Sequence, residues 1–480
     1  MQLNPPNGWS NFSKIDNKMK SNLMQEQLSR RTFLRVAAGA STSLWLASCG
    51  RSRTPSEGEE NAPSAAEAIR VTIQSGWSAE EGDFWPIAIE MFHDKPENAD
   101  IRVELINTPV APDNFWAAMN SGDAPDIYHA YVPGFNSLEI APKNVVLPLD
   151  DFIAQSQYID LDDYLPQQWD DKKWGGKTWA LPVTEGGPVS AFSWQVDQVE
   201  AAGLDATNGP SSWEEVIDWA DQLTTYDASG NVDVVGYDPL DAMGFRLEMW
   251  SIYFDTPLLS DDKRTLLLDQ GSWDQVLDLF RDIYQGIGIE QMTAHKEQWG
   301  YWSGEGSGFG NGERAMIMNG YWQPGDFRNT TELDAATVAY GWVPCKNERR
   351  KRAMIGSHSL WLTNKTEQPN EAFRFMEYIM SEEVNLMEFD LRGGFMWSKS
   401  LVAKLDTTGY PGLDFFMQMP NTADDFYSFS EFATPISGQL NSQWTQAVQA
   451  VITKEKSSQQ ALAEINTTLQ AAMDEAYQDI

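Results

Sequence analysis

The stretch Ile69–Leu105, IRVTIQSGWSAEEGDFWPIAIEMFHDKPENADIRVEL, sets the fold class of this chain. Its two ends, 69–73 and 101–105, alternate apolar and polar residues, and this pattern predicts two short strands. Between them, residues 79–92 have the pattern of a helix. A strand, a helix and a second strand at this spacing are typical of an α/β fold with a mainly parallel sheet.

A third short strand is predicted from Asp126 to about residue 130, after a turn in the segment SGDAPDIY at 121–128. In open α/β sheets, ligands bind beyond the carboxyl ends of the strands. His129 and Tyr131, at the end of the third strand, are therefore candidates for ligand contact, and so is Trp77, which follows the first strand. Each of the three is also compatible with a packed core position, and the sequence leaves both interpretations open.

The segment Ser29–Cys49, SRRTFLRVAAGASTSLWLASC, has the parts of an export signal. The pair Arg30 and Arg31 has the twin-arginine pattern, and the apolar run that follows, 36–47, is shorter than the roughly 20 residues that span a bilayer. Small residues before Cys49 resemble the lipobox of bacterial lipoproteins. A short buried helix is the structural alternative, which the coincidence of the three parts disfavours.

We therefore expect residues 1–49 to be a twin-arginine lipoprotein signal peptide, with translation starting at Met1 or Met24. Residues 50–68 are rich in Ser, Pro, Glu and Ala, which predicts a flexible tether. Lipid on Cys49 is then the only link to the membrane, and it holds the exported protein at the outer face of the cytoplasmic membrane.

Composition excludes several kinds of partner. A net charge of −36 disfavours nucleic acid and anionic lipid surfaces. The chain has only two cysteines, Cys49 and Cys345, so no intramolecular disulfide is expected once the first is lipidated. Its four histidines have no metal-ligand spacing, and we expect neither a metal nor a cofactor. The 20 tryptophans exceed ordinary usage and suit a site in which rings stack on sugars.

Ordered landmarks along the chain give a family resemblance. They are GDAPDIY at 122–128, LPLD at 147–150, GKTWALP at 176–182, AGL at 202–204 with PSSWEEV at 210–216, FGNGERAMIMNGYW at 309–322 and GWVP at 341–344. In this order they resemble the family 1 extracellular solute-binding proteins, which are the sugar-binding subunits of ABC importers and include maltose-binding-protein-like chains. The resemblance covers nearly all of the chain after Cys49.

The resemblance implies two α/β lobes, each a mainly parallel sheet flanked by helices, joined by a hinge that closes around ligand. The first lobe is expected to comprise 69–181 and 354–403, and the second 182–353 and 404–480. It also implies a monomer that captures a sugar or oligosaccharide between the lobes and delivers it to an ABC transporter permease.

The expected ligand site combines aromatic rings with polar side chains. Sugars present C–H faces that stack on rings and hydroxyls that need fixed hydrogen-bond partners. Gly320 precedes Trp322, a position that the family uses for sugar stacking, and its missing side chain permits close approach of the backbone. The remaining expected contacts are Trp77, Asp126, His129, Tyr131, Glu185, His358 and Trp397.

Other functions are weighed from motifs. The glycine-rich segment 304–312 and the Gly-Lys-Thr at 176–178 both fail the spacing of a phosphate-binding loop. Neither a G-x-S-x-G nor an H-E-x-x-H motif occurs, so we expect no catalytic residue and no enzyme. An extracellular glycoside hydrolase, which needs two carboxylates at a separation that sequence cannot give, is the alternative. A third hypothesis is a binder of cationic ligands such as polyamines, which the negative net charge of the chain favours.

Two further features are assigned structural roles. Apolar residues at helical spacing in 273–284, 444–452 and 462–473 predict core-facing helices. The basic run 349–352 is compatible with a solvated turn or with an acidic patch of a partner.

Overall fold

The computed structural model describes residues 68–75, 77, 83–106, 112–130, 136–300, 306–330, 335–347, 350–478 and 480. These residues belong to one compact unit, Ala66–Ile480. The predicted signal peptide with Met24 and Cys49, the tether up to residue 67, and the site candidate Tyr131 lie outside the described residues.

The first sheet has the strand order β2–β1–β3–β13–β6. The strands are β1 (Ile69–Ser75), β2 (Ile101–Ile106), β3 (Ile127–Ala130), β6 (Ala180–Val183) and β13 (His358–Leu362). β1 pairs in parallel with β2 and β3, whereas β13 is antiparallel to β3 and β6. The strands β1, β2 and β3 confirm the three strands that the alternation predicts.

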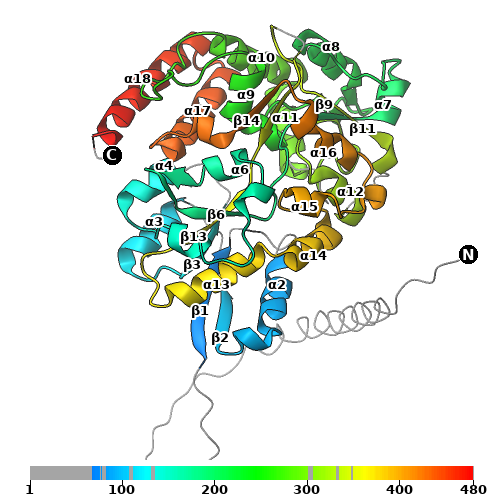
Figure 1. Cartoon of the computed structure of the whole chain (residues 1–480). Coiled ribbons are helices and arrows are strands. Elements are labelled where there is room, and N and C mark those ends of the chain that lie inside the picture. The colour runs from blue at the N-terminus through cyan, green and yellow to red at the C-terminus, as the bar shows by residue number, and fades with distance from the viewer. Residues whose placement is uncertain are drawn as a thin grey trace, which may run out of the picture. The chain divides into compact units, whose positions relative to one another are not determined.

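Two helices cover this first sheet through aromatic contacts. α2 (Phe84–His93) lies between β1 and β2 in the chain, as predicted, and α13 (Pro369–Ile379) packs beside it (Figure 1). The rings of Phe92 on α2 and Phe375 on α13 meet edge to face at 5.2 Å, and both side chains are buried. Burying an aromatic side chain of this size contributes about 1.5–3 kcal/mol, which explains how α2 is held on the sheet.

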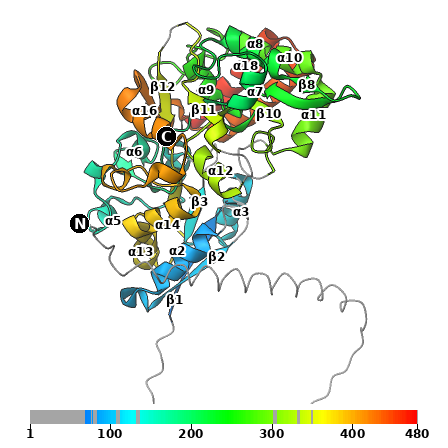
Figure 2. The same ribbon diagram turned by 90° about the vertical axis from the view of Figure 1, so that its right-hand side faces the viewer.

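The second sheet has the order β11–β7–β10–β9–β8. Its strands are β7 (Ala191–Gln195), β8 (Thr225–Tyr226), β9 (Val232–Tyr237), β10 (Arg314–Asn319) and β11 (Val338–Gly341). Around it pack α8 (Trp213–Leu223), α10 (Trp273–Ile287), α17 (Ser437–Ile452) and α18 (Ser458–Ala476). Figure 2 shows α8, α10 and α18 grouped with β8, β10 and β11. The apolar stripes predicted in 273–284, 444–452 and 462–473 are buried here, as expected.

The prediction of mainly parallel sheets is wrong for the second sheet, where only β9 and β10 pair in parallel. In the first sheet, one strand, β13, is reversed. The reason lies in how the chain passes between the sheets. β7 begins where the chain arrives from β6 of the first sheet, and β13 begins where it arrives from β12 (Arg352–Ile355), so both enter from the edge at which the neighbouring strands end. β8 is antiparallel to β9, the next strand along the chain.

The passage from β6 to β7 is the segment Thr184–Ser190, which we call the crossing segment. Its backbone is held on both sides, since Gly186 N–H donates to the Phe395 carbonyl at 2.9 Å and Val189 N–H to the Met354 carbonyl at 2.9 Å. Thr184 has a φ of 49°, which is rare for a β-branched residue and costs free energy. The crossing segment is therefore tightly specified by its neighbours.

The basic run 349–352 lies partly in a two-stranded sheet of β12 (Arg352–Ile355) and β14 (Asp425–Ser428). Arg352 is buried and pairs with Asp255 and Asp425, and Arg350 donates to Asp425 at 2.7 Å. The interpretation of this run as a solvated turn is wrong for Arg352, because its side chain is buried between two carboxylates. Arg349 lies outside the described residues.

Shorter elements complete the described chain: α3 (Pro112–Ser121), α4 (Ser137–Ile140), α5 (Asp150–Ile153), α6 (Gln167–Asp170), β4 (Lys173–Trp174), β5 (Lys177–Thr178), α7 (Val196–Ala201), α9 (Leu247–Tyr253), α11 (Ile289–Gln298), α12 (Gln323–Thr330), α14 (Glu382–Arg392), α15 (Lys399–Val402) and α16 (Leu413–Thr422). In the part of the chain that the structure describes, no helix has both the length and the apolar character needed to cross a bilayer.

Candidate functional site

A buried group of polar and aromatic side chains lies where β1 and β3 end. Ser75 is the last residue of β1, and its hydroxyl lies 3.0 Å from Nδ1 of His129 on β3. The Trp77 backbone N–H donates to the same hydroxyl at 3.2 Å. The Trp77 ring meets the His129 ring edge to face, with the centroids 4.7 Å apart. The prediction that both residues lie at the carboxyl edge of the first sheet is confirmed by this geometry.

A second histidine joins the group from β13. Nε2 of His129 lies 2.9 Å from Nδ1 of His358, and the two rings are stacked with centroids 4.9 Å apart. Both side chains are buried. Burial, together with His358 and Arg392, lowers the pKa of His129 well below its ordinary value, so His129 is neutral at neutral pH.

Glu185 brings a carboxylate from the crossing segment. Its Oε2 lies 3.3 Å from Nε2 of His358, and its Oε1 accepts from Nη1 of Arg392 at 2.6 Å. Burial alone would raise the pKa of Glu185, but the charge of Arg392 and the hydrogen bond from His358 lower it to about 2. Glu185 is therefore an ionised, hydrogen-bonded anchor.

Arg392 links two carboxylates, Glu185 and Glu388, to the Trp77 ring. The guanidinium stands 4.1 Å from the centre of the Trp77 ring, a cation–π contact, and Nη2 donates to Glu388 at 2.6 Å. Glu388 is almost fully buried, and burial raises its pKa to about 7, although Arg392 acts in the opposite direction. We call Ser75, Trp77, His129, Glu185, His358, Glu388 and Arg392 the polar cluster.

Tyr321, which follows β10, ties the second sheet to the crossing segment. Its backbone N–H donates to the Pro188 carbonyl at 3.0 Å, and its hydroxyl donates to the Phe395 carbonyl at 3.1 Å. A Cβ atom at Gly187 would lie 2.5 Å from the Tyr321 ring, so the ring needs a glycine there. Side chains from both sheets therefore meet at the crossing segment.

Gly320 and Trp322 flank this tyrosine. A Cβ atom at Gly320 would lie 2.2 Å from the Trp322 ring, so the ring lies directly over the glycine backbone. Trp322 is half-buried and packs against apolar residues of two core clusters. The ring is thus neither a fully buried core residue nor an isolated surface residue.

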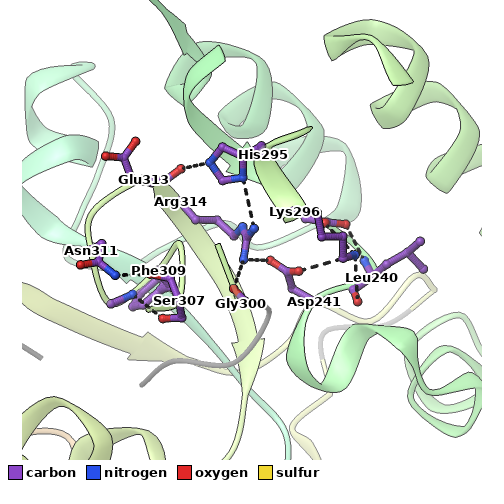
Figure 3. A network of polar contacts seen from close by, with 12 residues as sticks. Leu240, Asp241, His295, Lys296, Gly300, Ser307, Phe309, Asn311, Glu313 and Arg314 are labelled. Carbon is purple, nitrogen blue, oxygen red and sulfur yellow. Dashed lines mark hydrogen bonds and ion pairs between the residues drawn. The ribbon is translucent and has the colours of Figure 1, made fainter. Parts of the chain in front are cut away.

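A second polar network lies inside the second lobe (Figure 3). Arg314 on β10 pairs with Asp241, and Lys296 on α11 pairs with Asp238 at 3.0 Å and with Asp241 at 3.7 Å. Nη2 of Arg314 lies 3.3 Å from Nδ1 of His295, and Nη1 donates to the Gly300 carbonyl at 3.4 Å. Two cations thus balance two carboxylates in a buried network, which favours a structural role.

A model of the family described as bacterial extracellular solute-binding protein matches residues 88–412, more than half of the chain. The chain belongs to this family. The family assigned from the ordered landmarks is thereby confirmed. A comparison with curated protein sequences gave no significant match.

Solved structures of similar fold agree with this assignment. CpMnBP1 with mannotriose bound is 18% identical with a TM-score of 0.71, and the match covers 83% of this chain and 99% of that chain. Maltose-bound MalE3 of T. maritima is 19% identical with a TM-score of 0.64, covering 84% and 100%. The GacH receptor of Streptomyces glaucescens GLA.O is 17% identical with a TM-score of 0.66, covering 85% and 99%. The two-lobe fold predicted for this solute-binding protein is confirmed.

The structure brings four of the predicted site residues of this solute-binding protein into direct contact: Trp77, His129, Glu185 and His358. Gly320 and Trp322 lie on either side of Tyr321, whose hydroxyl is near Glu185 and Arg392. Whether any of these side chains contacts a ligand stays a prediction. The Trp77 ring is only 7% exposed and Arg392 covers it, so little of it is open for stacking on a sugar.

Two predicted site residues lie apart from the polar cluster. Asp126 precedes β3, at the end of the strand opposite to that of His129, and its carboxylate accepts from the backbone N–H and the hydroxyl of Thr72 at 2.7 Å each. It holds β3 against β1, a structural role that the sequence did not indicate. Trp397 is buried in an apolar cluster with its ring 6.1 Å from that of Phe395.

Sequence reasoning missed Arg392 and Glu388. Their spacing of four residues, followed by Gly393 in the left-handed region at a φ of 76°, marks an ion pair at the end of a helix. A glutamate and an arginine four residues apart near the end of a helix are common, however. Only the contact of Arg392 with Glu185 separates this pair from the others. Among the described residues, no group of three or more His, Cys, Asp or Glu side chains is arranged to hold a metal ion.

Proposed function

We propose that this solute-binding protein captures a sugar or oligosaccharide between its two lobes and delivers it to an ABC transporter permease. The family membership carries this proposal, because its members are extracellular binders of solutes. Three proteins of the same fold were crystallised with mannotriose, maltose or acarbose, which favours a carbohydrate.

The chemistry of the described residues supports a carbohydrate ligand. Half-buried Trp322 offers a ring beside glycine backbone, and the polar cluster supplies fixed donors and acceptors at the crossing segment. Rings and fixed polar groups are the two features that sugar recognition requires. Three predicted contacts have less support. Asp126 binds Thr72 away from the polar cluster, and Trp397 is packed in apolar surroundings. Tyr131 lies outside the described residues.

Equilibrium titration against a carbohydrate panel, followed by tryptophan fluorescence, tests the proposal. The panel contains mannobiose, mannotriose, maltose, tagatose and ribitol, with spermidine as the cationic comparison. We expect saturable binding of at least one sugar. Binding of spermidine alone would favour the polyamine alternative, and binding of none would remove the support for a carbohydrate.

A glycoside hydrolase is the alternative from another functional class, and one observation bears on it. Glu388 and Glu185 have pKa values moved apart, to about 7 and about 2, as in an acid and nucleophile pair. Both carboxylates, however, bind the same Arg392 guanidinium, and Glu388 is only 1% exposed. Released reducing ends, assayed on mannotriose and maltose, separate the two functions: we expect none.

We further propose that the protein is exported as a monomer and anchored by lipid on Cys49. The twin-arginine and lipobox patterns support export and the anchor, and the family resemblance implies the monomer. Cys345 is a buried free thiol, so Cys49 is the only other cysteine available for modification. Mass spectrometry of membrane-extracted protein should find an acylated N-terminus at Cys49, and a mature chain that keeps Arg30 would contradict the anchor.

A further inference from the structure

Four side chains form a continuous hydrogen-bonded chain from the crossing segment to the end of β1, and we call it the histidine chain. It runs from Glu185 to His358 at 3.3 Å, from His358 to His129 at 2.9 Å, and from His129 to Ser75 at 3.0 Å. All distances are within or close to hydrogen-bonding range. Ser75 in turn accepts from the Trp77 backbone N–H at 3.2 Å.

When both imidazoles are neutral, only one assignment of donors and acceptors satisfies every hydrogen bond in the histidine chain. The Glu185 carboxylate only accepts, so Nε2 of His358 carries a hydrogen and its Nδ1 accepts. Nε2 of His129 must then donate to His358, and Nδ1 of His129 accepts from the Ser75 hydroxyl. Every donor and acceptor in this arrangement has a partner.

One added proton reverses the direction of these hydrogen bonds. The proton goes to His358, because its ring faces the Glu185 carboxylate whereas His129 faces the Arg392 cation. Protonated His358 must donate from Nδ1, so His129 accepts there and donates from its other nitrogen to Ser75. The Ser75 oxygen then receives two N–H donors and loses His129 as its acceptor. Its side chain is 2% exposed, and an unsatisfied buried donor is costly.

Charged and titratable groups face the histidine chain from every element packed on it. Arg392 and Glu388 face it from α14, and Tyr321 faces Glu185 from the segment after β10. Beside the start of β13, buried Lys172 donates to the Ser357 carbonyl at 3.2 Å and pairs with Asp171 at 2.6 Å. Arg392 holds Glu185 ionised, so the carboxylate acts as a fixed acceptor while the histidines titrate.

The position of the histidine chain couples it to both parts of the proposed site. One end is Glu185, next to Thr184 with its unfavourable positive φ, in the segment on which the lobes are joined. The other end orients the backbone of Trp77 at the ligand-binding edge of the first sheet. A reversal of the hydrogen bonds along the histidine chain therefore acts on the crossing segment at one end and on the edge of the first sheet at the other.

We propose that the histidine chain makes ligand capture depend on pH, with affinity falling as pH drops through the range in which His358 and His129 take up a shared proton. This inference rests on the proposed function. His129 and His358 act as positioning residues and need not touch the ligand. The expected sign rests on the Ser75 hydroxyl, which in the protonated form has no other acceptor among the described residues.

NMR chemical shifts of the imidazole nitrogens, measured on histidine-labelled protein without ligand, test the hydrogen bonds of the histidine chain. The protein has only four histidines to assign. At neutral pH we expect both His129 and His358 neutral with hydrogen on Nε2. We expect the two rings to take up one shared proton as a coupled pair when the pH falls. A pair that titrates independently, or either ring charged at neutral pH, would overturn the proposal.

Mannotriose titration at about pH 5 and about pH 7.5 tests the consequence. We expect about tenfold weaker binding at the lower pH. The double variant His129→Gln/His358→Gln keeps amide donors and acceptors at both places but cannot be protonated, so its affinity should change less than about threefold. His93→Gln, on α2, should behave as the parent. If mannotriose binds at neither pH, the titration is repeated with a sugar of the panel that binds. If no sugar of the panel binds, the proposed ligand class fails, while the nitrogen shifts still test the hydrogen bonds of the histidine chain. An unchanged pH dependence in the double variant would overturn it.

Discussion

At the scale of single residues, Arg392 accounts for the arrangement of the polar cluster. Its guanidinium binds Glu185 and Glu388 through separate nitrogens and lies over the Trp77 ring. A planar fork with several donors suits this role, which a lysine would fill poorly. One buried cation therefore links the crossing segment, α14 and the edge of the first sheet.

Glu388 makes this arrangement sensitive to alkaline pH. Burial raises its pKa to about 7, so the folded state holds its proton more strongly than the unfolded state does. The stability that this group contributes is complete below its ordinary pKa and is lost as pH rises through about 7. Glu388→Gln cannot ionise and should escape that loss.

Urea unfolding of Glu388→Gln and the parent, at several pH values between about 5 and about 8.5, measures the effect. The difference in unfolding free energy should grow in favour of the variant as pH rises, while the contribution of His129 cancels. Glu455→Gln, at an exposed position, should show no such trend. A difference that is flat with pH would show that Glu388 is ionised throughout.

Trp322 is the residue most suited to stack on a sugar. Trp322→Ala should weaken binding of the sugar identified in the panel by about tenfold to a hundredfold, because a stacking contact is lost. The ring is half-buried, so the same change should also cost about 1–3 kcal/mol of stability. Calorimetric titration and thermal melting measure the two effects, and retained affinity with a large drop in melting temperature would assign Trp322 to the core.

Gly320→Ala probes the same ring without removing it. The added Cβ would lie 2.2 Å from the Trp322 ring, so the ring must move and sugar affinity should fall. The matched control is Gly286→Ala near the end of α10, where no atom lies within 4 Å of the new Cβ. That change should leave affinity intact and be neutral or mildly stabilising, because alanine suits a helix better than glycine.

At the scale of elements, the buried network of Figure 3 fixes β10 and α11 to the segment that precedes α9. Burial and the neighbouring Asp238 raise the pKa of Asp241, whereas Lys296 and Arg314 prevail over burial and lower that of Asp238. The two carboxylates thus depend on two cations from different elements. Removing one member leaves a buried charge without compensation.

Asp238→Asn should therefore cost about 3–5 kcal/mol of unfolding free energy, since Lys296 and Arg314 lose the buried carboxylate whose pKa they lower. Denaturant unfolding at neutral pH measures this. Lys456→Gln, which breaks the exposed pair with Glu464, is the control and should have no measurable effect. Equal effects of the two changes would mean that the buried network contributes little to stability.

At the scale of the whole molecule, the crossing segment joins two sheets that belong to separate lobes of the fold. A ligand that contacts both lobes binds the closed form more tightly and shifts the population toward it. Small-angle scattering with saturating sugar from the panel should therefore give a smaller radius of gyration than scattering without sugar. An unchanged profile at saturation would count against closure, and the lobe limits predicted at 181 and 354 stay a prediction.

Local patterns were sufficient for some elements of this protein. Alternation located β1, β2 and β3, and helical spacing located α10, α17 and α18. Ser212 caps the helix that Trp213 begins, since its hydroxyl accepts from Glu215 N–H at 3.2 Å. Each of these features is encoded within a few residues, and the ordered landmarks added the family and the two-lobe fold.

The tertiary structure alone decided strand direction and the partners of buried charges. The reversal of β13 depends on where the chain returns from the other sheet, which no short window of sequence contains. Asp126, a predicted ligand contact, accepts hydrogen bonds from Thr72, because its place at the start of β3 puts it opposite that residue of β1. Arg392 pairs with Glu185 across a separation of 207 residues. Periodicity records which face of an element is apolar, whereas the partner of a buried charge is set by packing between distant elements.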